Sequence, residues 1–336
     1  MKVDAGMMMG KLEDVPQRVR ELEAQGFDGL ITAETSSDPF FPLLLAAEHS
    51  ERIELMTSIA VAFARNPMLL ANIGNDLQAY SKGRFILGLG SQIRPHIQKR
   101  FSMPWSHPAA RMRELIQATR AIWDCWYEGA KLDFRGEFYT HTLMTPMFTP
   151  TNNSYGPPRV VLAAVGPKMT EVAGEVADGM LVHAFTTPKY LEEVSLPAID
   201  RGLASAGRSR DDFELCYPAF VVTGRDEKEW EQMRTATTRQ IAFYGSTPAY
   251  RGVLEAHGWG ELQNELNTMS KQGQWAEMGT RITDEMLEQF AVVAEPHNVA
   301  SEMKKRFSGR IDRVLCTFPF AGDEERRAYI EELRSA

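Results

Sequence analysis

The feature that most constrains the fold is an alternation of short apolar segments with amphipathic, helix-forming segments along the whole chain. Strands that alternate with helices imply parallel pairing, because a parallel neighbour can be reached only through a crossover connection. Several apolar segments have no polar face, as strands in a sheet covered on both sides require. The expected strands are residues 3–9, 28–34, 53–62, 84–90, 159–165, 179–185, 213–222 and 313–320. Eight such units predict an α/β fold, a closed (β/α)8 TIM barrel, with a doubly wound open sheet as the alternative.

Three connections are longer than an ordinary turn between a strand and a helix: residues 91–110, 131–158 and 240–295. We interpret them as insertions into a single barrel domain that spans residues 1–336. The segment LDFRGEFYTH within the second insertion predicts a β-hairpin. The first and third insertions follow expected strands four and seven, so they emerge at the face where barrel active sites lie. Both are therefore candidate covers for a substrate.

Composition excludes several classes of function. The net charge of −8 and the lack of a long basic run argue against nucleic acid as a partner. No apolar stretch reaches about 18 residues, and the N-terminus has no signal-peptide pattern, so we expect a cytoplasmic protein without a membrane partner. The three cysteines, Cys125, Cys216 and Cys316, lie far apart, which suits a reducing compartment and indicates no metal site.

The expected strands deliver few ionisable groups to the face at which they end. Glu34 after the second strand and His183 after the sixth are the two that titrate closest to neutral pH. No His-x-His opens the first strand, no lysine ends a strand, and no carboxylate pair is placed for glycosidic cleavage. These patterns argue against metal-dependent hydrolysis, Schiff-base chemistry and glycoside hydrolysis. A face of methyl groups, aromatic rings and backbone amides instead indicates a flat cofactor that performs the chemistry.

The turn AVGPKM after the fifth expected strand indicates where an anion could bind. Pro167 suits the first helical turn, where its missing N–H does no harm. The amides of Lys168, Met169 and Thr170 are expected to be unpaired and to point toward the barrel mouth, and Gly166 lets an anion approach the backbone. A helix N-terminus with free amides favours a phosphate, and Lys168 adds charge. The alternative interpretation is an ordinary barrel turn with a surface lysine.

Three segments, ELMTSIAVAFARNP, RFILGLGS and VGPKMTEVAGEVADGMLV, occur in this chain order and resemble the bacterial luciferase-like monooxygenase superfamily. They look most like its F420 (deazaflavin)-dependent oxidoreductase branch, and the resemblance covers essentially the whole chain. It implies a TIM barrel, usually dimeric, with the cofactor at the C-terminal face and its phosphate on the turn at residues 166–169. It also implies a non-proline cis peptide at Ser58–Ile59, with Ile59 against one face of the ring. A β-bulge with trans geometry is the alternative.

The resemblance implies a set of cofactor-binding residues at the ends of expected strands two to six. They are Glu34, Ser58, Ile59, Gly90, Ser91, Gln92, Val165, Gly166, Pro167, Lys168, Met169 and His183. Family members often end strand two with Asp-His, whereas this chain has Glu34-Thr35, so the histidine proton donor is absent. A glutamate that some members carry after strand four is also missing. Glu34 and His183 remain the candidate catalytic groups.

The candidate substrate contacts are Met9, His96, Trp105 and Phe318. Met9 and Phe318 belong to expected strands one and eight, and the other two lie on the first insertion. Lys99 and Arg100 on the same insertion are candidates to hold the acidic tail of F420, which carries glutamates. Ordinary solvated loop charge is the alternative interpretation of these two side chains.

The sequence therefore predicts an F420-dependent oxidoreductase that transfers a hydride between the deazaflavin ring and a small organic substrate. The expected reacting group of the substrate is an activated double bond or a carbonyl. An FMN-dependent two-component monooxygenase of the same fold is the first alternative, and a non-catalytic deazaflavin- or flavin-binding protein is the second. No metal is expected. The expected partners are the small-molecule substrate, a second copy of the chain in a homodimer, and an enzyme that reduces F420 or flavin.

Overall fold

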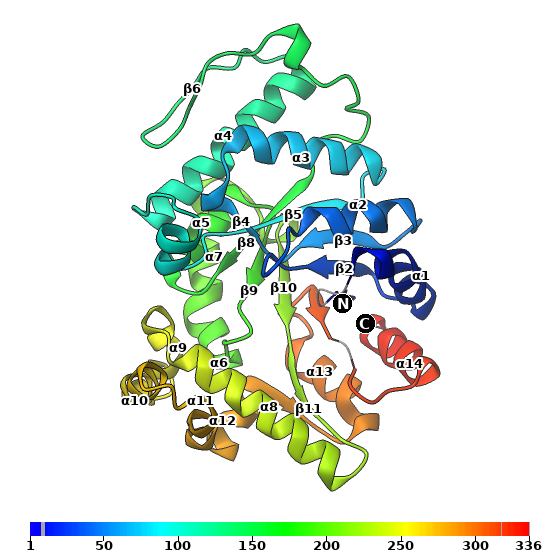
Figure 1. The fold of residues 1–336 in the computed structure, drawn as a ribbon, viewed down its shortest axis with the longest axis vertical. Coiled ribbons are helices and arrows are strands. Elements are labelled where there is room, and N and C mark those ends of the chain that lie inside the picture. The colour runs from blue at the N-terminus through cyan, green and yellow to red at the C-terminus, as the bar shows by residue number, and fades with distance from the viewer. Residues whose placement is uncertain (8–10, 317, 336) are drawn as a thin grey trace.

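The computed structural model describes residues 1–7, 11–316 and 318–335 of the chain. Eight strand positions form one parallel sheet in the order β3-β2-β1-β13-β10-β9-β8-β5, and pairing of β3 with β5 closes it. The strands are β1 (Lys2–Gly6), β2 (Gly29–Thr32), β3 (Glu54–Thr57), β5 (Phe85–Gly90), β8 (Arg159–Ala164), β9 (Gly179–Val182), β10 (Glu214–Pro218) and β13 (Arg313–Leu315). A short strand, β4 (Ala60–Val61), continues the third position along β5. The predicted TIM barrel is confirmed (Figure 1), and the open-sheet alternative is wrong.

Helices surround the barrel (Figure 1). They are α1 (Val15–Gln25), α2 (Phe40–Glu48), α3 (Pro67–Tyr80), α4 (Pro108–Glu128), α5 (Pro167–Val176), α6 (Pro188–Tyr190), α7 (Leu196–Ser205), α13 (Val299–Phe307) and α14 (Asp323–Arg334). Helix α1 shows the local cause of this layer, because Val15, Val19 and Leu22 recur at helical spacing and are all buried. Gly26 then ends the helix in the left-handed conformation, at φ 95°, which glycine adopts without strain.

The interior of the barrel is a packed core. One apolar side chain from each of six strands fills it: Ile31, Met56, Ile86, Val161, Leu181 and Cys216. Each is buried, and each lies on a strand whose alternate residues face the outer helices. The layer therefore closes the barrel axis, as in other barrels of this architecture, and any ligand must bind above it at the barrel mouth.

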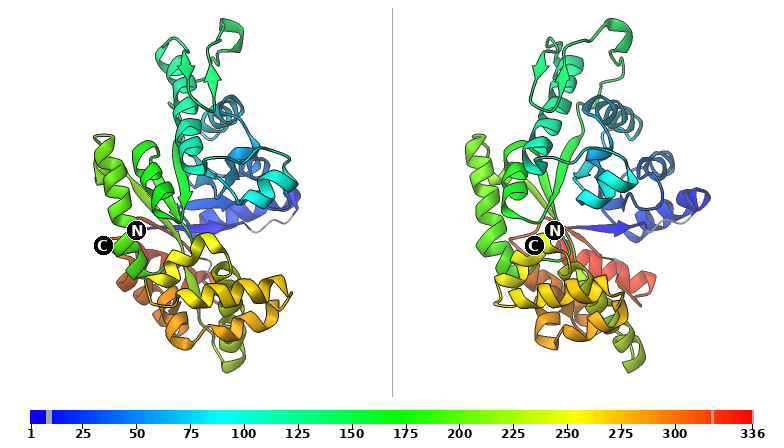
Figure 2. Two further views of the ribbon diagram at one scale, coloured as in Figure 1. Left: turned by 90° about the vertical axis from the view of Figure 1, so that its left-hand side faces the viewer. Right: turned by 60° about the vertical axis from the view of Figure 1, so that its left-hand side comes forward.

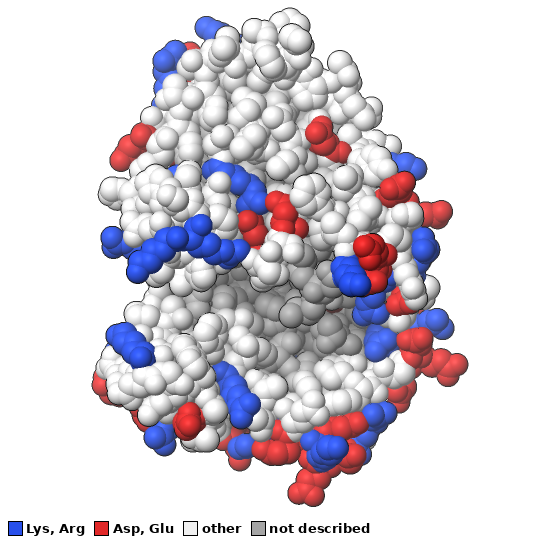
Figure 3. Space-filling model, in the orientation of Figure 1, with Lys and Arg blue, Asp and Glu red and all other residues white. Residues whose placement is uncertain are grey.

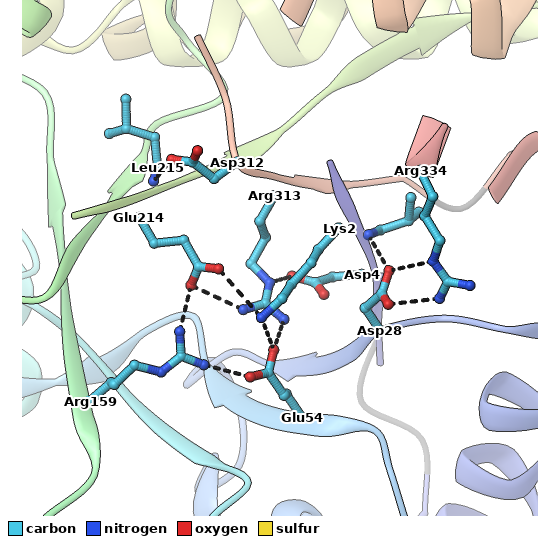
Figure 4. A network of polar contacts seen from close by, with 11 residues as sticks. Lys2, Asp4, Asp28, Glu54, Arg159, Glu214, Leu215, Asp312, Arg313 and Arg334 are labelled. Carbon is cyan, nitrogen blue, oxygen red and sulfur yellow. Dashed lines mark hydrogen bonds and ion pairs between the residues drawn. The ribbon is translucent and has the colours of Figure 1, made fainter. Parts of the chain in front are cut away.

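A network of six charged side chains occupies the end of the barrel at which the strands begin (Figure 4). Its members are Lys2, Asp4, Glu54, Arg159, Glu214 and Arg313. Arg313 is only 1% exposed and contacts three carboxylates, with Nε 2.6 Å from Oδ2 of Asp4 and Nη1 3.1 Å from Oε2 of Glu214. Its Nη2 contacts Glu54. Gly29 makes room for this arrangement, because a Cβ there would lie 2.3 Å from Oδ1 of Asp4.

The insertion between α4 and β8 contains the predicted hairpin. Its strands are β6 (Phe134–Arg135) and β7 (Thr140–His141), which pair antiparallel. The carboxylate of Glu114 on α4 accepts hydrogen bonds from the three consecutive backbone amides of residues 137–139, at 2.9, 2.7 and 2.6 Å. The hairpin is therefore folded back along α4 toward the first turns of that helix.

Expected strand seven is wrong in its second half. The chain leaves the barrel after β10, and β11 (Phe220–Val222) pairs instead with β12 (Ala291–Val293) in a separate two-stranded parallel sheet. The insertion therefore begins near residue 220 rather than at 240. Between its two strands lie α8 (Glu227–Gly245), α9 (Arg251–Glu255), α10 (Gly260–Lys271), α11 (Trp275–Met278) and α12 (Asp284–Phe290). These elements bury an apolar cluster of their own, which includes Ile241, Leu266 and Phe290.

Expected strand eight is also shorter than predicted. It ends at Leu315, and the backbone of Phe318 and Phe320 has φ values of 45° and 65°, outside the range of a strand. Expected strand one ends at Gly6. No helix in the described residues combines the length and apolar character that crossing a bilayer would need.

Candidate cofactor and substrate site

The carboxyl ends of the barrel strands lie on the face that Figures 1 and 3 present. Figure 2 shows β1 pointing toward the side from which the 91–107 segment and helices α9–α11 project. Because the barrel strands are parallel, all of them end on that side. Figure 3 shows a hollow in the middle of this face, between the part that carries α3 and α4 and the part that carries α8–α12. The candidate site lies around this hollow.

The third strand position contains the irregular peptide that the resemblance implied. The bond between Ser58 and Ile59 is cis. The amide of Ser58 donates to the carbonyl of Thr32 at 2.6 Å, and the carbonyl of Ile59 accepts from the amide of Glu34 at 3.1 Å. Gly90 lies beside it, where a Cβ would be 2.8 Å from Cδ1 of Ile59. Ile59 is half-buried at the barrel mouth, and its contact with a cofactor ring stays a prediction.

Glu34 lies next to this peptide, but its carboxylate already has partners. One oxygen, Oε2, accepts the amide of Val61 at 2.7 Å and Nη1 of Arg65 at 2.6 Å. Arg65 also donates to Asp38 at 3.0 Å. The side chain of Glu34 is mostly buried. This is the geometry of a salt-bridged carboxylate that fixes the segment after the cis bond, and a direct role of Glu34 in chemistry stays a prediction.

The turn after β8 has an open, amide-lined corner. Gly166 precedes α5, and a Cβ built there would meet no atom within 4 Å. Pro167 has no amide proton, and the amides of Lys168 and Met169 have no acceptor among the described residues. The amide of Thr170 was expected to be free, but it donates to the carbonyl of Gly166 at 3.1 Å and closes the first helical turn. Two free amides and the exposed Lys168 side chain therefore remain for an anion.

His183 follows β9 and is covered by the insertion after β10. Its ring centroid lies 4.6 Å from that of Tyr244 and 4.7 Å from that of Tyr250. Nδ1 accepts the amide of Phe185 at 3.0 Å, so the neutral ring carries its proton on Nε2. Burial lowers the pKa of His183 to about 4, and the imidazole is therefore neutral at pH 7. It can donate one hydrogen bond, but it holds no second proton to release.

The first insertion is anchored by aromatic and guanidinium contacts. Trp105 packs edge-on against Phe63 with the ring centroids 5.7 Å apart. Arg111 of α4 lies 4.7 Å above the same ring and donates to the carbonyl of Pro104 at 2.7 Å. These contacts assign Trp105 a structural role in this loop. His96, in a π-helical turn of the same insertion, is exposed and remains available to a ligand.

Three exposed cations, Arg94, Lys99 and Arg100, lie on the first insertion. Arg100 is held over the site by its contact with the carbonyl of Thr35, directly after Glu34. Blue side chains are visible along the upper rim of the hollow in Figure 3. Against the net charge of −8 for the whole chain, this local excess of positive charge favours an anionic ligand at the rim.

The remaining predicted positions have mixed outcomes. Gln92 has φ 59°, and its carbonyl accepts the hydroxyl of Ser91 at 3.1 Å, so these two residues form a tight turn at the end of β5. The carbonyl of Val165 accepts the hydroxyl of Tyr190 at 3.2 Å. Phe318 is only 2% exposed and packs against Tyr329 of α14, and its contact with a substrate stays a prediction. Met9 lies outside the described residues.

Sequence reasoning missed three residues of the site, Arg65, Tyr244 and Tyr250. Arg65 lies within the segment ELMTSIAVAFARNP, but no spacing in the sequence pairs it with Glu34. The two tyrosines are separated from His183 by about 60 residues, and only the fold of the insertion brings them together. In residues 1–7, 11–316 and 318–335, no three potential metal ligands form a cluster.

Comparisons with known proteins agree with this fold. A family model described as luciferase-like monooxygenase matches residues 2–313. An uncharacterized protein of Mycobacterium tuberculosis is 57% identical over 334 residues, which cover 99% of this chain and 98% of the relative. The 5,10-methylenetetrahydromethanopterin reductase of Archaeoglobus fulgidus is 28% identical, with 94% and 92% covered. The coenzyme F420 dependent tetrahydromethanopterin reductase from Methanopyrus kandleri has a similar structure, with a TM-score of 0.77, 22% identity and 99% and 98% covered.

Proposed function

The chain belongs to the luciferase-like monooxygenase family, and we propose that it is an F420-dependent oxidoreductase that acts on a small organic substrate. When bound, F420 would supply or accept the hydride at its deazaflavin ring. The name of the structural neighbour, a coenzyme F420 dependent tetrahydromethanopterin reductase, supports this cofactor. The observation that carries the proposal is the corner at Gly166, where two unpaired amides and a lysine face open space on the same barrel end as Ile59.

The residues at the barrel mouth fit the chemical groups of F420. The amides of Lys168 and Met169, with the Lys168 ammonium, would hold the phosphate. Ile59, supported by the small Gly90, would lie against the ring. The cations of the first insertion would neutralise the glutamate tail, which FMN lacks. This excess of positive charge at the rim is the reason to prefer F420 over FMN.

The protein residues would contribute binding, orientation and exclusion of water. His183 would donate a hydrogen bond from Nε2 to the substrate or cofactor, because its Nδ1 is occupied by the amide of Phe185. Glu34 would hold the segment after β3 through Val61 and Arg65. Nδ1 of His183 is occupied by the amide of Phe185, and the Glu34 carboxylate is paired with Arg65, so neither group is a free general base. An electron-poor double bond or carbonyl, which would take the hydride from reduced F420 and its proton from water, is therefore favoured over an alcohol that needs a general base.

Titration of the purified protein with F420 and with reduced FMN tests the proposal. We expect F420 to bind, and the variants Lys168→Glu and Gly166→Asp to weaken it about tenfold each, because both place negative charge beside the phosphate. Lys271→Glu, a matched charge reversal at an exposed site on α10, should leave the affinity unchanged. Tight binding of reduced FMN without binding of F420 would replace the proposal with the flavin monooxygenase. Unchanged F420 affinity in both Gly166→Asp and Lys168→Glu would remove the phosphate from this corner.

A further inference from the structure

A continuous series of aromatic rings leads from His183 to the surface of the third insertion. The centroid of Tyr244 is 4.6 Å from that of His183 and 5.6 Å from that of Phe243, and Phe243 is 6.0 Å from Trp275. Tyr250 lies 4.7 Å from His183 on the other side. We call these five residues the aromatic track. Its inner end is at the carboxyl end of β9, and its outer end is on α11.

The outer half of the aromatic track is exposed without an evident structural need. Phe243 is 48% exposed and Trp275 is 52% exposed, whereas Tyr244 and Tyr250 are half-buried. Other rings fill the core of the third insertion: Phe185 stacks on Phe290 with the ring centroids 4.7 Å apart, and both side chains are fully buried. Single exposed aromatic residues are common on protein surfaces, but a connected series that reaches a candidate site indicates a binding surface.

The aromatic track is also free of cations. Guanidinium groups cover several other rings of the protein, such as Phe63 beneath Arg111, but no cation–π contact among the described residues involves a ring of the track. The exposed cations Arg94, Lys99, Arg100 and Lys168 lie on other elements than the rings of the track. The rings of the track are therefore suited to a neutral, flat group, and those cations to an anionic one.

We propose that the aromatic track binds a flat, conjugated and uncharged part of the substrate, and that Nε2–H of His183 donates to an oxygen of that substrate. The inference rests on the proposed function, since this molecule would be the partner of F420 in hydride transfer. Offset or edge-on stacking on the rings would orient the conjugated system, and the neutral imidazole would mark the position of its carbonyl oxygen. Burial keeps His183 neutral, which agrees with a hydrogen-bond donor for an uncharged acceptor.

Calorimetric titration of the cofactor-free protein with 4-phenyl-3-buten-2-one tests the binding class without any catalytic readout. We expect this conjugated ketone to bind more tightly than the saturated 4-cyclohexylbutan-2-one. Phe243→Leu and Trp275→Leu keep an apolar side chain but remove a ring, and each should weaken the conjugated ketone about three- to tenfold. Phe148→Leu, which removes a ring that is 71% exposed outside the track, is the matched control and should have no effect.

The hydrogen bond from His183 is tested with a second pair of probes. His183→Ala should weaken the conjugated ketone but not 1-phenyl-1-butene, which keeps the flat phenyl-alkene part but has a CH2 group in place of the carbonyl. Equal binding of the conjugated and saturated ketones, or equal affinity of the two track variants and the control, would overturn the proposal. F420 affinity is measured in the same variants and should be unchanged in Phe243→Leu and Trp275→Leu. Failure of F420 to bind, with the probe pattern intact, would remove the proposed function but leave the aromatic track as a binding surface.

Discussion

Replacing Arg313 by methionine should destabilise the barrel strongly. Arg313 is almost fully buried and contacts three carboxylates of the network in Figure 4. Without it, Glu54 and Glu214 still contact Lys2 and Arg159, but Asp4 keeps no cation. Removing one partner of a buried ion pair costs about 3–5 kcal/mol of unfolding free energy. We expect Arg313→Met to lose an amount in this range at pH 7.

The pH dependence of this loss identifies Asp4 as its source. Burial outweighs the attraction of Arg313 and raises the pKa of Asp4 to about 6, above its ordinary value of 3.8. The contribution of Asp4 to the unfolding free energy of the wild-type protein therefore falls by about 3 kcal/mol as the pH rises from 4 to 6 and then stays constant. In Arg313→Met the pKa of Asp4 rises further. The variant should continue to lose about 1.4 kcal/mol per pH unit above pH 6.

Glu54 provides the opposite dependence in the same network. Burial raises its pKa, but Arg313, Lys2 and Arg159 together lower it to about 2, below the ordinary 4.5. Its stabilisation is therefore present above pH 4.5 and is lost as the pH falls toward 2. Because the wild-type Glu54 is ionised from pH 5.5 to 8.5 and His183 lies outside this network, the difference in unfolding free energy between Arg313→Met and the wild type at each pH in that range reports Asp4.

Urea denaturation followed by circular dichroism at pH 5.5, 7.0 and 8.5 measures these differences. Arg135→Met is the matched control, because Arg135 forms an exposed pair with Asp133 worth less than about 1 kcal/mol. Adding Asp4→Asn to Arg313→Met should recover stability and abolish the pH dependence above pH 6, and it keeps the test usable if the single variant does not fold. A loss below about 1 kcal/mol, or one that is equal at all three pH values, would refute the reasoning.

Three further outcomes are expected. Gly90→Ala should weaken the binding of F420 about tenfold, because the new Cβ displaces the end of the Ile59 side chain. The unfolding free energy should fall by only about 1 kcal/mol. Equal F420 titrations of the wild type and the variant would contradict this expectation. The His183 imidazole should titrate near pH 4 by NMR. Its contribution to the unfolding free energy, about 3 kcal/mol, should be lost as the pH falls from 6.5 to 4. A titration midpoint near 6.5 would disprove the burial of the imidazole between Tyr244 and Tyr250. We propose that the predicted homodimer forms through exposed apolar side chains of α2 and α3. The double variant Phe41→Lys with Leu69→Lys should therefore be a monomer by light scattering. A double variant that remains dimeric would exclude this face.

The barrel is predictable because each strand has a recognisable local pattern in the sequence. Segments such as 84–90 and 159–165 are apolar on both faces, and each is followed by a helix with its own stripe of buried residues. The prediction failed at residues 213–222, which form a continuous apolar run but belong to two different sheets. Apolar periodicity reports that a residue is buried, and it does not report which strand lies beside it.

The site was less predictable than the fold, for a related reason. The free amides at residues 168 and 169 follow from local geometry, since any helix N-terminus leaves its first amides unpaired. The cis bond at Ser58–Ile59 was accessible only through resemblance to a family. The pairing of Glu34 with Arg65 and the enclosure of His183 by Tyr244 depend on contacts between distant segments, which no spacing in one sequence encodes.

The two ends of the barrel use charge in different ways, and this difference bears on the chemistry. At the end where the strands begin, three acids and three bases neutralise one another in a buried network. At the mouth, Glu34 forms an ion pair with Arg65, and burial lowers the pKa of His183 to about 4, which keeps its imidazole neutral at pH 7. Under the proposed function, the corner at Lys168 would hold the cofactor phosphate, and the bound cofactor would supply the reacting electrons. The protein residues would then act chiefly by holding the cofactor and the substrate in contact, so measurements of binding test the proposal more directly than replacement of proton donors.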